Sequence, residues 1–414
     1  MGIVVLKFGG SSVATREKLE HVIAHIESEK KKGNEVVVVV SAQGKTTDRL
    51  IAEEAEISKE PDKREHDVLV STGEQVTIAK LAMMLIDRGH KAVSLTGWQI
   101  PIITNCEYTN SKIRYIKNET ILDYLESGNV VVVAGFQGVA ENGDITTLGR
   151  GGSDTTAVAL AASLKADKCD IYTDVDGVYT SDPRVISEVK KLKSISYDEM
   201  LEMASMGAKV LHNRCVEIAK KYEIPLYVKS TFVEHSDGTA VIKENIEDLE
   251  ISGVTKDDYI SRITVIGIKN EIGKTFKLFK VLSDNQINVD VIVQSFGEYT
   301  VKDIAFTIKM NDLQKTLKIL KEKKTELGYK DITHTENLSK VSIVGAGIAN
   351  KPGVATKMFE ALYESNINMH MISTSEIKIS VLVDSNNANS AIREIHRKFF
   401  VWDMEISMSL FWHF

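Results

Sequence analysis

The chain has 414 residues, of which 43% are hydrophobic and 26% charged, proportions typical of a globular protein with two or three domains. Its formal net charge of −7 offers no basic surface for nucleic acid, and no apolar run approaches the roughly 20 residues that span a bilayer. Three widely spaced cysteines without a CxxC pair argue against a disulfide framework or a zinc site, and they fit a reducing cytoplasm. No basic segment followed by an apolar core opens the chain, so we expect no signal peptide.

The first 250 residues alternate short β-branched runs with longer amphipathic stretches, which is the pattern of an α/β domain. Val36–Val40 is apolar on both faces, as expected for a parallel strand whose sheet is covered by helices on both sides. The predicted strands are Ile3–Phe8, Glu35–Ser41, Ala92–Leu95, Val130–Ala134, Lys168–Thr173 and Pro225–Val228. The predicted helices are Val13–Lys32, Gln75–Arg88, Asp154–Leu164 and Tyr197–Tyr222.

The remainder of the chain contains a sequence repeat with a period of about 80 residues. S-R-I-T-V-I-G (Ser261–Gly267) matches S-K-V-S-I-V-G (Ser339–Gly345), and each copy continues with a glycine, a helical pattern and a second strand start. Two copies of this length indicate two duplicated small domains rather than a solenoid. Each copy has the order β-α-β-β-α-β of a ferredoxin-like fold. We expect the linker at the acidic stretch Glu244–Glu250 and just after it.

The first predicted strand ends in a lysine followed by two glycines, within K-F-G-G-S-S (Lys7–Ser12). Two glycines let the main chain approach a ligand closely, and Ser11 or Ser12 is placed to cap the next helix, whose N-terminus attracts anions. Lys7 would add a point charge to the same anion, for which phosphate is the usual candidate. The alternative is a tight strand-to-helix turn with a surface lysine, and this motif alone does not decide between the two.

A second glycine-rich turn, T-T-L-G-R-G-G-S-D-T-T-A, occupies residues 146–157. Its three glycines expose main-chain amides, and Arg150 and Asp154 supply opposite charges at one place. A turn that only caps a helix, through Ser153 or Asp154, requires neither three glycines nor an arginine. The pattern therefore favours a binding site.

A third segment, Y-T-D-V-D-G-V-Y-T-S-D-P-R (Tyr172–Arg184), contains three aspartates but is not a calcium-binding EF-hand. It lacks the third acidic position, and Val185 stands where an EF-hand needs a glutamate. A loop that leaves the carboxyl end of a strand with an aromatic side chain suits a nucleotide lying over the sheet edge. An acidic surface loop is the alternative.

Three other stretches match nucleotide-binding motifs only in part, and we reject them. Q-G-K-T (Gln43–Thr46) and I-G-K-T (Ile272–Thr275) lack the first glycine of a Walker A motif, and Gly345–Asn350 lacks the third glycine of a dinucleotide fingerprint.

Two further stretches each contain one charged candidate. Glu74, in S-T-G-E-Q (Ser71–Gln75), is either a helix-dipole partner or a counter-charge for an ammonium group. Lys209 lies in the predicted helical stretch M-A-S-M-G-A-K-V-L-H, where a lysine is ordinarily solvated, and the histidine that ends this stretch is assigned no role.

Five motifs together resemble the ordered signature of aspartate kinases, which belong to the amino acid kinase superfamily: K-F-G-G-S-S, S-T-G-E-Q, G-R-G-G-S-D-T-T-A, Y-T-D-V-D-G-V-Y-T-S-D-P-R and M-A-S-M-G-A-K-V-L-H. The paired repeats resemble ACT domains, the amino-acid-sensing modules of that family. The resemblance covers about residues 1–400. It implies an α/β amino acid kinase fold, with a mostly parallel sheet between helices, followed by two ferredoxin-like ACT domains. The implied domains are 1–245 (kinase), 246–260 (linker), 261–337 (first ACT) and 338–414 (second ACT).

The resemblance implies that MgATP phosphorylates the side-chain carboxylate of L-aspartate to 4-phospho-L-aspartate, the first step toward lysine, threonine, methionine and diaminopimelate. A carboxylate with a reference pKa of about 3.9 is already ionised at neutral pH, so the reaction needs no general base. The obstacle is repulsion between the nucleophile and the phosphates. Catalysis must then come from positioning and positive charge, with Mg²⁺ as a clamp.

The resemblance also implies roles for individual residues. Lys7, Asp154 and Lys209 would be catalytic, with the two lysines neutralising phosphate charge and Asp154 organising them. Arg150 would bind the α-carboxylate of aspartate with its bidentate fork, and Glu74 would bind the ammonium group. The other substrate contacts would be Ser41, Thr47, Gly151, Gly152 and Ser153. The nucleotide contacts would be Lys7, Phe8, Gly9, Gly10, Ser11, Thr173, Asp174, Tyr179, Asp182, Arg184 and Lys209. The metal would be carried by ATP and held by no protein ligand.

For the C-terminal half, the resemblance implies feedback regulation of a cytoplasmic homo-oligomer, a dimer or tetramer with contacts between ACT domains. Lysine, threonine or both would bind and stabilise a less active arrangement. Neither nucleic acid nor a membrane is an expected partner. The implied effector contacts are Asn270, Gly273, Gln294, Asp303, Asn350, Asn368, Ser373, Thr374, Ser375 and Glu376.

Three alternatives stay open at this point. The aromatic segment 400–414 is either a final strand of the second repeat or an additional tail. A non-catalytic amino-acid sensor on a dead kinase scaffold is a second reading of the whole chain, although the five charged motif residues are intact. A kinase for glutamate, acetylglutamate or uridylate is the third, although the G-R-G-G-S-D turn and the ACT pair point away from it.

Overall fold

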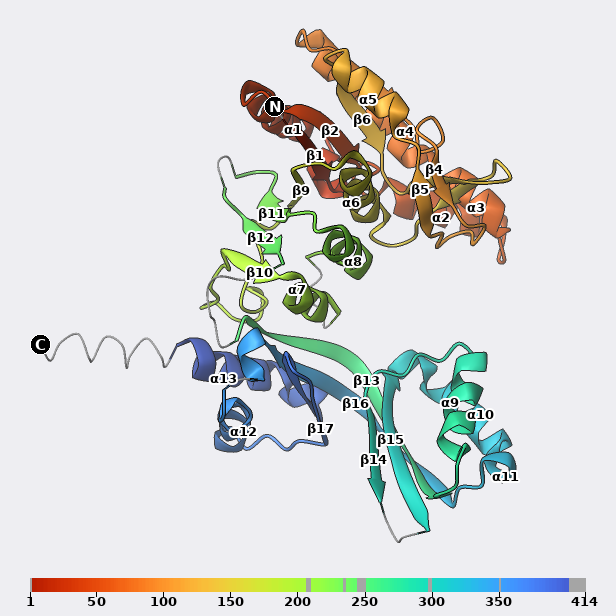
Figure 1. The fold of residues 1–414 in the computed structure, drawn as a ribbon. Coiled ribbons are helices and arrows are strands. Elements are labelled where there is room, and N and C mark those ends of the chain that lie inside the picture. Colours follow the sequence, from red (N-terminus) through yellow and green to blue (C-terminus); the bar gives the residue numbers. More distant parts are fainter. Residues whose placement is uncertain are drawn as a thin grey trace, which may run out of the picture. The chain divides into compact units, whose positions relative to one another are not determined.

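The computed structural model describes residues 2–205, 210–233, 236–243, 251–296, 300–349 and 351–401. The chain divides into two compact units, which are coloured along the sequence in Figure 1. The first unit comprises Met1–Tyr179 and Lys190–Glu247, and the second comprises Thr180–Val189 and Asp248–Phe414.

An eight-stranded sheet in the order β10-β12-β11-β9-β1-β2-β6-β3 forms the centre of the first unit. Six of its strands, β11 through β3 in that order, are mutually parallel, while β12 runs antiparallel to β11. The bounds are β1 (Ile3–Phe8), β2 (Glu35–Val40), β3 (Ala92–Leu95), β6 (Val130–Ala134), β9 (Lys168–Thr173), β10 (Ser194–Ser196), β11 (Leu226–Ser230) and β12 (Thr239–Ile242). The six predicted strands are therefore confirmed, four of them with unchanged bounds.

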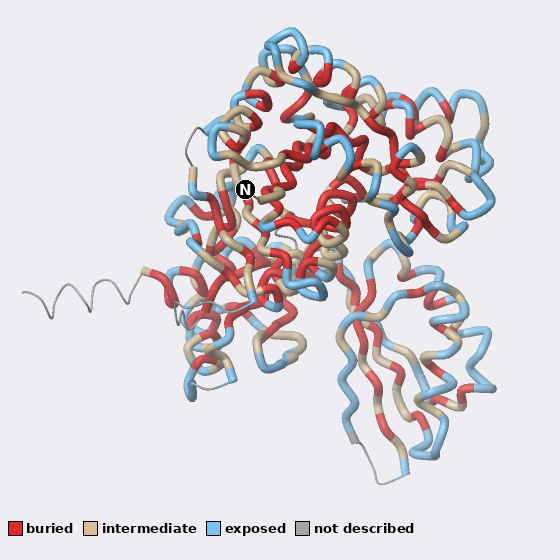
Figure 2. Tube along the Cα trace, turned by 45° about the horizontal axis from the view of Figure 1, so that its top comes forward, coloured by how far each residue is buried: buried red, intermediate tan, exposed pale blue. Residues whose placement is uncertain are grey.

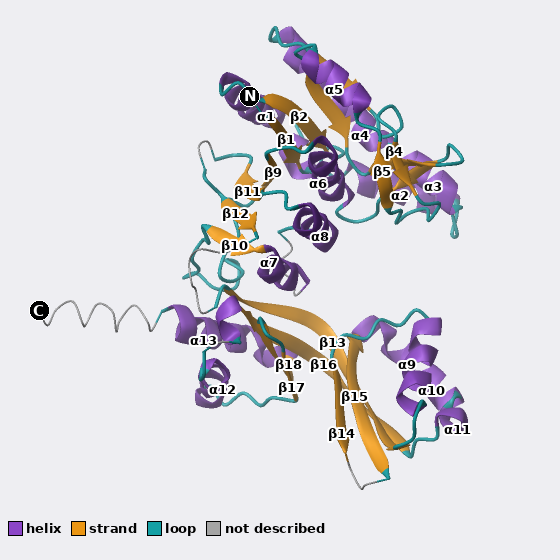
Figure 3. Ribbon diagram, in the orientation of Figure 1, coloured by secondary structure: helices purple, strands orange, loops and turns teal. Residues whose placement is uncertain are grey.

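Helices cover both faces of this sheet (Figure 3). α1 (Arg16–Lys31) and α4 (Thr72–Asp87) pack their apolar sides into one core with alternate residues of β1, β2 and β6. Because strand side chains alternate between faces, the remaining buried valines of β1 and β2 point to the other face, where α6 (Gly152–Leu164) contacts both strands. All of Val36–Val40 is fully buried, as the run of valines predicted. Figure 2 shows these central strands as buried.

A smaller, four-stranded sheet in the order β5-β4-β7-β8 belongs to the same unit. Its strands have three or four residues each, too short for a clear alternation of apolar and polar positions, and the sequence analysis missed them. The bounds are β4 (Ile102–Thr104), β5 (Ile113–Ile116), β7 (Gln137–Ala140) and β8 (Ile145–Thr147). The other helices of this unit are η1 (Gly10–Val13), α2 (Thr46–Ile57), α3 (Lys63–Val70), α5 (Glu119–Glu126), α7 (Tyr197–Met203) and α8 (Asn213–Tyr222).

Two helix predictions were wrong in detail. The predicted helix Tyr197–Tyr222 is two helices, because His212 has an extended conformation (φ −85°, ψ 138°) directly before α8. The long helix after the first strand begins only at Arg16, where the Thr15 side chain accepts a hydrogen bond from a first-turn amide. Ser11 and Ser12 instead lie within the short 3-10 turn η1 and do not cap a helix.

α3 and α4 together form one helical stretch, Lys63–Asp87, that is long and apolar enough to cross a membrane by length and composition. Half of its most apolar window is buried inside the protein. Leu81 and Leu85 are fully buried in the core beneath the sheet. The stretch is therefore explained as a core helix.

The second unit is built on a six-stranded sheet in the order β14-β15-β13-β16-β18-β17. The bounds are β13 (Gly253–Lys269), β14 (Ile292–Phe296), β15 (Val301–Lys309), β16 (Asp331–Val344), β17 (Met371–Thr374) and β18 (Lys378–Asp384). Its helices are α9 (Lys274–Asp284), η3 (Met310–Asp312), α10 (Leu313–Glu322), α11 (Lys324–Leu327), η4 (Ala346–Ile348), α12 (Val354–Glu364), η5 (Ser385–Asn387) and α13 (Ala388–Phe400).

Two long strands, β13 and β16, each serve both repeats. The second half of β13 pairs with β15 and with the first half of β16, which completes the β-α-β-β-α-β order of the first repeat. The second half of β16 begins the second repeat and pairs with β18. Its other neighbour is the first half of β13, where Gly253 lies opposite Val344 and Asp257 opposite Lys340.

The linker prediction therefore needs correction, because residues 253–260 are strand and fill the fourth-strand position of the second repeat. Segment 400–414 was one candidate for the final strand of the second repeat, but residues 253–260, which precede both repeats in the chain, occupy that position. Residues 402–414 lie outside the described part of the chain.

Residues 180–189 also depart from the expected division, which placed them in the kinase domain. Ile186 packs in the core of the second unit with α12 and α13. The buried Thr180 hydroxyl lies 2.8 Å from Nε2 of buried His396, and the Ser181 hydroxyl donates a 2.9 Å hydrogen bond to the carbonyl of Val254. The segment is a structural part of the second unit.

Candidate active site

The candidate site of the first unit begins where parallel strands of the large sheet end at a common edge. Lys7 is the penultimate residue of β1 and lies in register with Val39 of β2 and Ile171 of β9. The loops that follow β1, β2 and β9 therefore meet here, as expected for ligand sites in open parallel sheets. Main-chain hydrogen bonds join them: the Ser41 amide donates to Phe8, and the Gly9 amide donates to Tyr172.

Lys7 and Asp154 form a buried ion pair at this edge. The Lys7 Nζ atom lies 2.5 Å from Oδ1 of Asp154, and Lys7 is only 8% exposed. Asp154 lies in the first turn of α6, where the helix dipole favours an acidic side chain. The sequence analysis paired these residues only through the family resemblance, and the structure brings them into direct contact.

The glycines after Lys7 leave room beside its ammonium group. A Cβ atom added to Gly9 would lie 3.5 Å from Lys7 Nζ, with one other heavy atom within 4 Å. At Gly10, a Cβ would lie 2.8 Å from the carbonyl of Ala42, so only glycine lets this turn pack on the loop after β2. Open main chain next to a buried ammonium group fits an anionic phosphate.

Among the residues that the structure describes, no group of three or more His, Cys, Asp and Glu side chains is close enough to hold a metal ion. Mg²⁺ prefers to keep several waters and to bind through phosphates with one or two carboxylates. Lys7 and the open glycine main chain fit the phosphates of a nucleotide that would carry such a metal.

Glu74 is buried in the first turn of α4, and one of its oxygens lacks a partner. Its Oε1 accepts a 3.1 Å hydrogen bond from the Ala42 amide, whereas Oε2 is buried without a hydrogen bond. Burial raises the pKa of Glu74 to about 8, although the Ala42 amide favours the ionised form. An ammonium group reaching Oε2 would satisfy this oxygen and restore its charge.

The second glycine-rich turn presents Arg150 to solvent between two glycines in the left-handed region. Gly149 has φ +73° and Gly151 has φ +67°, and a Cβ on Gly151 would lie 2.3 Å from the His212 ring. Ser153 is 8% exposed and packs on Gly135, where a Cβ would lie 2.7 Å from that of Ser153. The turn is thus wedged between the end of β6 and the residue that precedes α8.

The other predicted nucleotide contacts are distributed over both units. Thr173 and Asp174 follow β9 and share a 3.0 Å hydrogen bond, and Tyr179 donates to Asp176, which raises the pKa of the tyrosine to about 12. Asp182 and Arg184 belong to the second unit, where they form an ion pair of 2.8 Å.

Three other residues predicted to contact ligands lie at the margin of this sheet edge or present only their main chain to it. The Phe8 ring is fully buried and stacks on Tyr172, so only the main chain of this residue lies at the sheet edge. Ser11 is exposed in η1, and Thr47 is half-buried in the first turn of α2. Lys209 lies outside the described residues.

Two charged residues near the turn were missed by the sequence analysis. Asp67, fully buried in α3, accepts hydrogen bonds from the amides of Thr109 and Thr147. Arg214, in the first turn of α8, donates to the carbonyls of Leu148 and Ser111. Neither belongs to a recognisable motif, because their partners are main-chain groups of segments about 40 to 100 residues away in the sequence.

The predicted effector contacts lie on the second unit, mostly at turns and edges. Gly273 is the left-handed residue before α9, and Asp303 accepts a hydrogen bond from the Gly267 amide. Gln294 lies on exposed edge strand β14. Asn270 follows β13, Asn368 and Thr374–Glu376 are exposed, Ser373 is half-buried in β17, and Asn350 lies outside the described residues.

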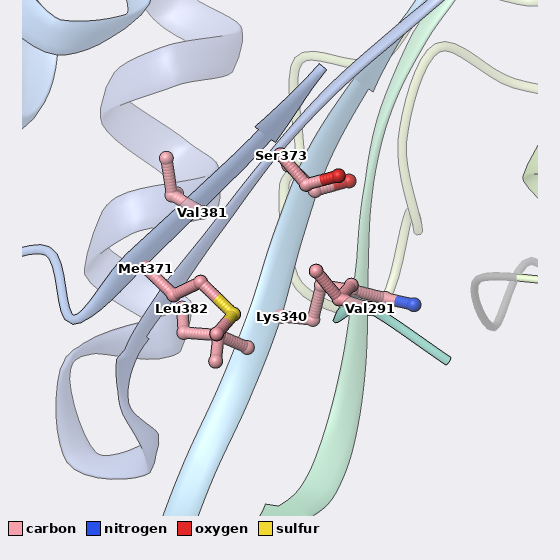
Figure 4. Close-up of a pocket in the computed structure, with 7 residues that line it drawn as sticks. Val291, Lys340, Met371, Ser373, Val381 and Leu382 are labelled. Carbon is pink, nitrogen blue, oxygen red and sulfur yellow. The ribbon is translucent and has the colours of Figure 1, made fainter. Parts of the chain in front are cut away.

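A shallow hollow lies in this unit and includes one predicted effector residue, Ser373 (Figure 4). Lys340 lines it, and the ammonium group of this buried lysine pairs with Asp290. The full lining is Val291, Lys340, Met371, Ser373, Ser380, Val381 and Leu382. The other predicted effector residues do not line this hollow.

Comparison with known proteins agrees with this architecture. Residues 2–230 match the amino acid kinase family, and residues 263–323 and 341–399 each match an ACT domain. The chain is 50% identical over 402 residues to the aspartokinase of Bacillus sp. (strain MGA3), covering 96% of this chain and 97% of that protein. It is 48% identical to aspartokinase 2 of Bacillus subtilis (strain 168), covering 96% and 98%.

A solved structure of E. coli aspartokinase III in complex with aspartate and ADP superposes with a TM-score of 0.81 at 27% identity. The alignment covers 96% of this chain and all of the E. coli chain. The same E. coli enzyme has also been solved with lysine and aspartate. With its ordered motifs, its Lys7–Asp154 pair and its two ACT repeats, the chain belongs to the amino acid kinase family and, within it, to the aspartokinases.

Proposed function

We propose that this aspartokinase transfers the γ-phosphoryl group of MgATP to the side-chain carboxylate of L-aspartate at the β1–α6 edge of the first unit. The buried Lys7–Asp154 pair carries this assignment, because a lysine held beside bare glycine main chain is suited to polyanionic phosphate. Burial lowers the local dielectric constant and strengthens the interaction of Lys7 with a phosphate. In this proposal Lys7, Gly9, Gly10 and Ser11 hold the β- and γ-phosphates.

The aspartate is oriented by two charges of opposite sign. Arg150 binds the α-carboxylate and Glu74 binds the ammonium group, with Ser41, Thr47 and the main chain of residues 151–153 lining the rest. The reacting carboxylate is already ionised, so no side chain has to remove a proton from it. Its attack on phosphorus releases ADP and yields a mixed anhydride, 4-phospho-L-aspartate.

Charge neutralisation supplies the catalytic effect. Lys7 lowers the repulsion between the two anions, Asp154 keeps the Lys7 side chain in place, and Lys209 contributes positive charge on the leaving-group side. Mg²⁺ carried by the nucleotide would supply further positive charge to the transferring phosphoryl group. Thr173, Asp174, Tyr179, Asp182 and Arg184 are the remaining candidate contacts for the nucleotide.

The second unit supplies feedback regulation. We infer that lysine, threonine or both bind the ACT repeats of a cytoplasmic homo-oligomer and lower activity. The ACT matches and the lysine complex of the E. coli relative support this inference. Exposed edge strand β14 offers unpaired main-chain groups, as a strand that pairs across a subunit interface would.

An acyl-phosphate assay tests the proposal directly. Protein, MgATP and L-aspartate are incubated with hydroxylamine, which traps the anhydride as a hydroxamate. We expect hydroxamate with aspartate but not with glutamate, and we expect lysine or threonine to suppress it. Lys7→Met and Asp154→Asn should each lower kcat by about 1,000-fold, because each removes a charge that acts in the transition state.

Lys117→Met is the matched control, because Lys117 is exposed and its side chain has no described partner. Circular dichroism and the melting temperature establish that each variant is folded. A folded Asp154→Asn enzyme with normal kcat would remove Asp154 from the mechanism. If the folded wild-type protein binds lysine or threonine but forms no hydroxamate, the protein is a non-catalytic amino-acid sensor.

A further inference from the structure

Arg214 stands out because its guanidinium group is directed to main-chain oxygens of two distant segments. Its Nη1 donates a 2.5 Å hydrogen bond to the carbonyl of Leu148, and its Nη2 donates a 2.8 Å hydrogen bond to the carbonyl of Ser111. No described carboxylate forms an ion pair with it. Burial lowers the pKa of this half-buried guanidinium group and the charge of Glu217 offsets that effect only in part, so a well-made set of hydrogen bonds is needed to keep the cation there.

The first of these segments leads directly into the proposed substrate-binding turn. Leu148 is fully buried, and its amide donates to the carbonyl of Phe136 while its carbonyl accepts from Arg214. Both main-chain groups of Leu148 are therefore fixed. Arg150 follows two residues later and is exposed, with left-handed glycines on either side. Glycine-flanked residues sample many conformations unless neighbouring contacts restrict them.

The second segment, residues 109–111, packs on the same turn. A Cβ on Gly149 would lie 2.9 Å from Asn110 Oδ1 and 3.0 Å from the carbonyl of Thr109. The Ser111 amide donates to the carbonyl of Thr147, one residue before Leu148. By binding the carbonyls of both Leu148 and Ser111, Arg214 holds residues 109–111 against the turn.

Asp67 fastens the same two segments from α3. Its carboxylate accepts hydrogen bonds from the Thr109 amide, the Thr147 amide and the Thr147 hydroxyl, with lengths between 2.7 and 3.1 Å. An acidic and a basic side chain from different helices thus hold the base of one turn. Hydrogen bonds from two supporting side chains are expected where a functional side chain must be positioned to within a fraction of an ångström.

We propose that Arg214 is a positioning residue for aspartate binding, which fixes Leu148 and the 109–111 segment so that Arg150 is presented to the α-carboxylate. The proposal rests on the assignment of Arg150 in the proposed function. Arg214 acts through the turn and makes no contact with the reacting atoms. Its loss should therefore weaken aspartate binding and leave the nucleotide side of the site unchanged.

Steady-state kinetics of a double-mutant cycle test this. We expect Arg214→Met to raise the KM for aspartate at least tenfold, with the KM for ATP changed less than twofold and kcat less than threefold. Arg214→Lys should fall between Arg214→Met and wild type, because one ammonium group does not reproduce the two-pronged fork. In an Arg150→Met background, Arg214→Met should add less than a twofold change, since the residue it positions is gone.

Arg114→Met is the matched control, because Arg114 is exposed and its one ion-pair partner among the described residues is Glu141, at 3.4 Å. The α-amide of L-aspartate, which lacks the charge of the α-carboxylate, gives a second readout. Wild-type enzyme should prefer aspartate to this amide, and Arg150→Met and Arg214→Met should lose that preference to a similar degree.

The outcomes separate the two assignments. If Arg150→Met leaves the aspartate KM unchanged, the role of Arg150 fails and the proposal for Arg214 fails with it. If Arg150→Met raises this KM but folded Arg214→Met and Arg214→Lys do not, only the proposal for Arg214 is overturned. Equal rises in the KM values of aspartate and ATP, or additive effects in the cycle, would show a general structural role and would also overturn it. Should Arg214→Met not fold, Arg214→Lys carries the same comparison.

Discussion

At the scale of single residues, the role proposed for Glu74 predicts that aspartate binding depends on pH. Burial raises the pKa of Glu74 to about 8 in the free protein, so its ionised form is the minor one at pH 7. Only the ionised form attracts an ammonium group strongly. We expect kcat/KM for aspartate to rise about tenfold per pH unit up to pH 8 and then level off, because this ratio reports pKa values of the free enzyme.

The substitution Glu74→Gln checks the assignment. It should remove the rising limb and raise the aspartate KM about 10- to 100-fold, the range for loss of a hydrogen bond to a charged group. The KM for ATP should show no matching change. A wild-type profile that is flat between pH 6 and 9 would contradict the role given to Glu74.

At the scale of elements, the turn before α6 depends on glycine for two separate reasons. Gly151→Ala places a Cβ at positive φ and also within 2.3–2.6 Å of the His212 side chain. Gly89→Ala is the matched control, since Gly89 has φ +84° with nothing within 4 Å of the added Cβ. Both should lose about 1 kcal/mol of unfolding free energy to backbone strain.

Only Gly151→Ala should impair catalysis, because the turn must shift to relieve the contact with His212. We expect kcat/KM for aspartate to fall about 100-fold, the effect of displacing a binding group by about 1 Å. Thermal unfolding and kinetics of both variants check this pair. Equal kinetic effects of the two substitutions would mean that strain, and not the contact, controls the turn.

At the scale of the first unit, a buried charge network predicts loss of stability in acid. Burial by itself would raise the pKa of Glu29, but hydrogen bonds from Lys32 and Asn34 and the charge of Lys168 outweigh it and lower the pKa to about 2. The stabilisation is fully present above pH 4.5 and is lost as the pH falls from 4.5 toward 2, because the unfolded state binds the proton first. At about 1.4 kcal/mol per pKa unit the shift corresponds to about 3 kcal/mol, and screening by solvent lowers the contribution to about 2 kcal/mol.

Chemical denaturation of Glu29→Gln and wild type between pH 3 and 7 measures the stabilisation that ionised Glu29 contributes. The variant should be less stable than wild type at pH 7, and the difference should shrink as the pH approaches 3. Glu53→Gln, which alters an exposed pair with Arg49, should show almost no change. A difference that does not depend on pH would exclude ionised Glu29 as its source.

At the scale of the whole molecule, the chain passes from nucleotide-binding candidates directly into the second unit after Tyr179. Thr180→Val removes the hydroxyl that meets buried His396, and we expect about 1 to 3 kcal/mol lower stability of the second unit. Asp182 and Arg184, two candidate nucleotide contacts, lie on the same segment, so their proposed role predicts that the KM for ATP rises while that for aspartate stays constant. A stability loss with both KM values unchanged would make the segment purely structural.

The sequence by itself determined the central strands, the repeat and the main charged candidates. The run Val36–Val40 indicates a strand buried on both faces, and it is fully buried in the structure. K-F-G-G-S-S and G-R-G-G-S-D are local patterns that indicate candidate sites, although K-F-G-G-S-S alone also allows a simple turn. The resemblance to aspartate kinases, confirmed by the family matches, assigned the partners to these motifs.

Only the tertiary structure decided where the non-local contacts fall. Asp67 and Arg214 bind main-chain carbonyls and amides, which are the same for every residue type and leave no trace in the sequence. The first half of β13 completes the sheet of the second repeat because it pairs with β16, about 80 residues away in the sequence. Residues 180–189 belong to the second unit because Ile186 packs in its apolar core. Periodicity identifies an element, but its partner is chosen by the free energy of packing the whole chain.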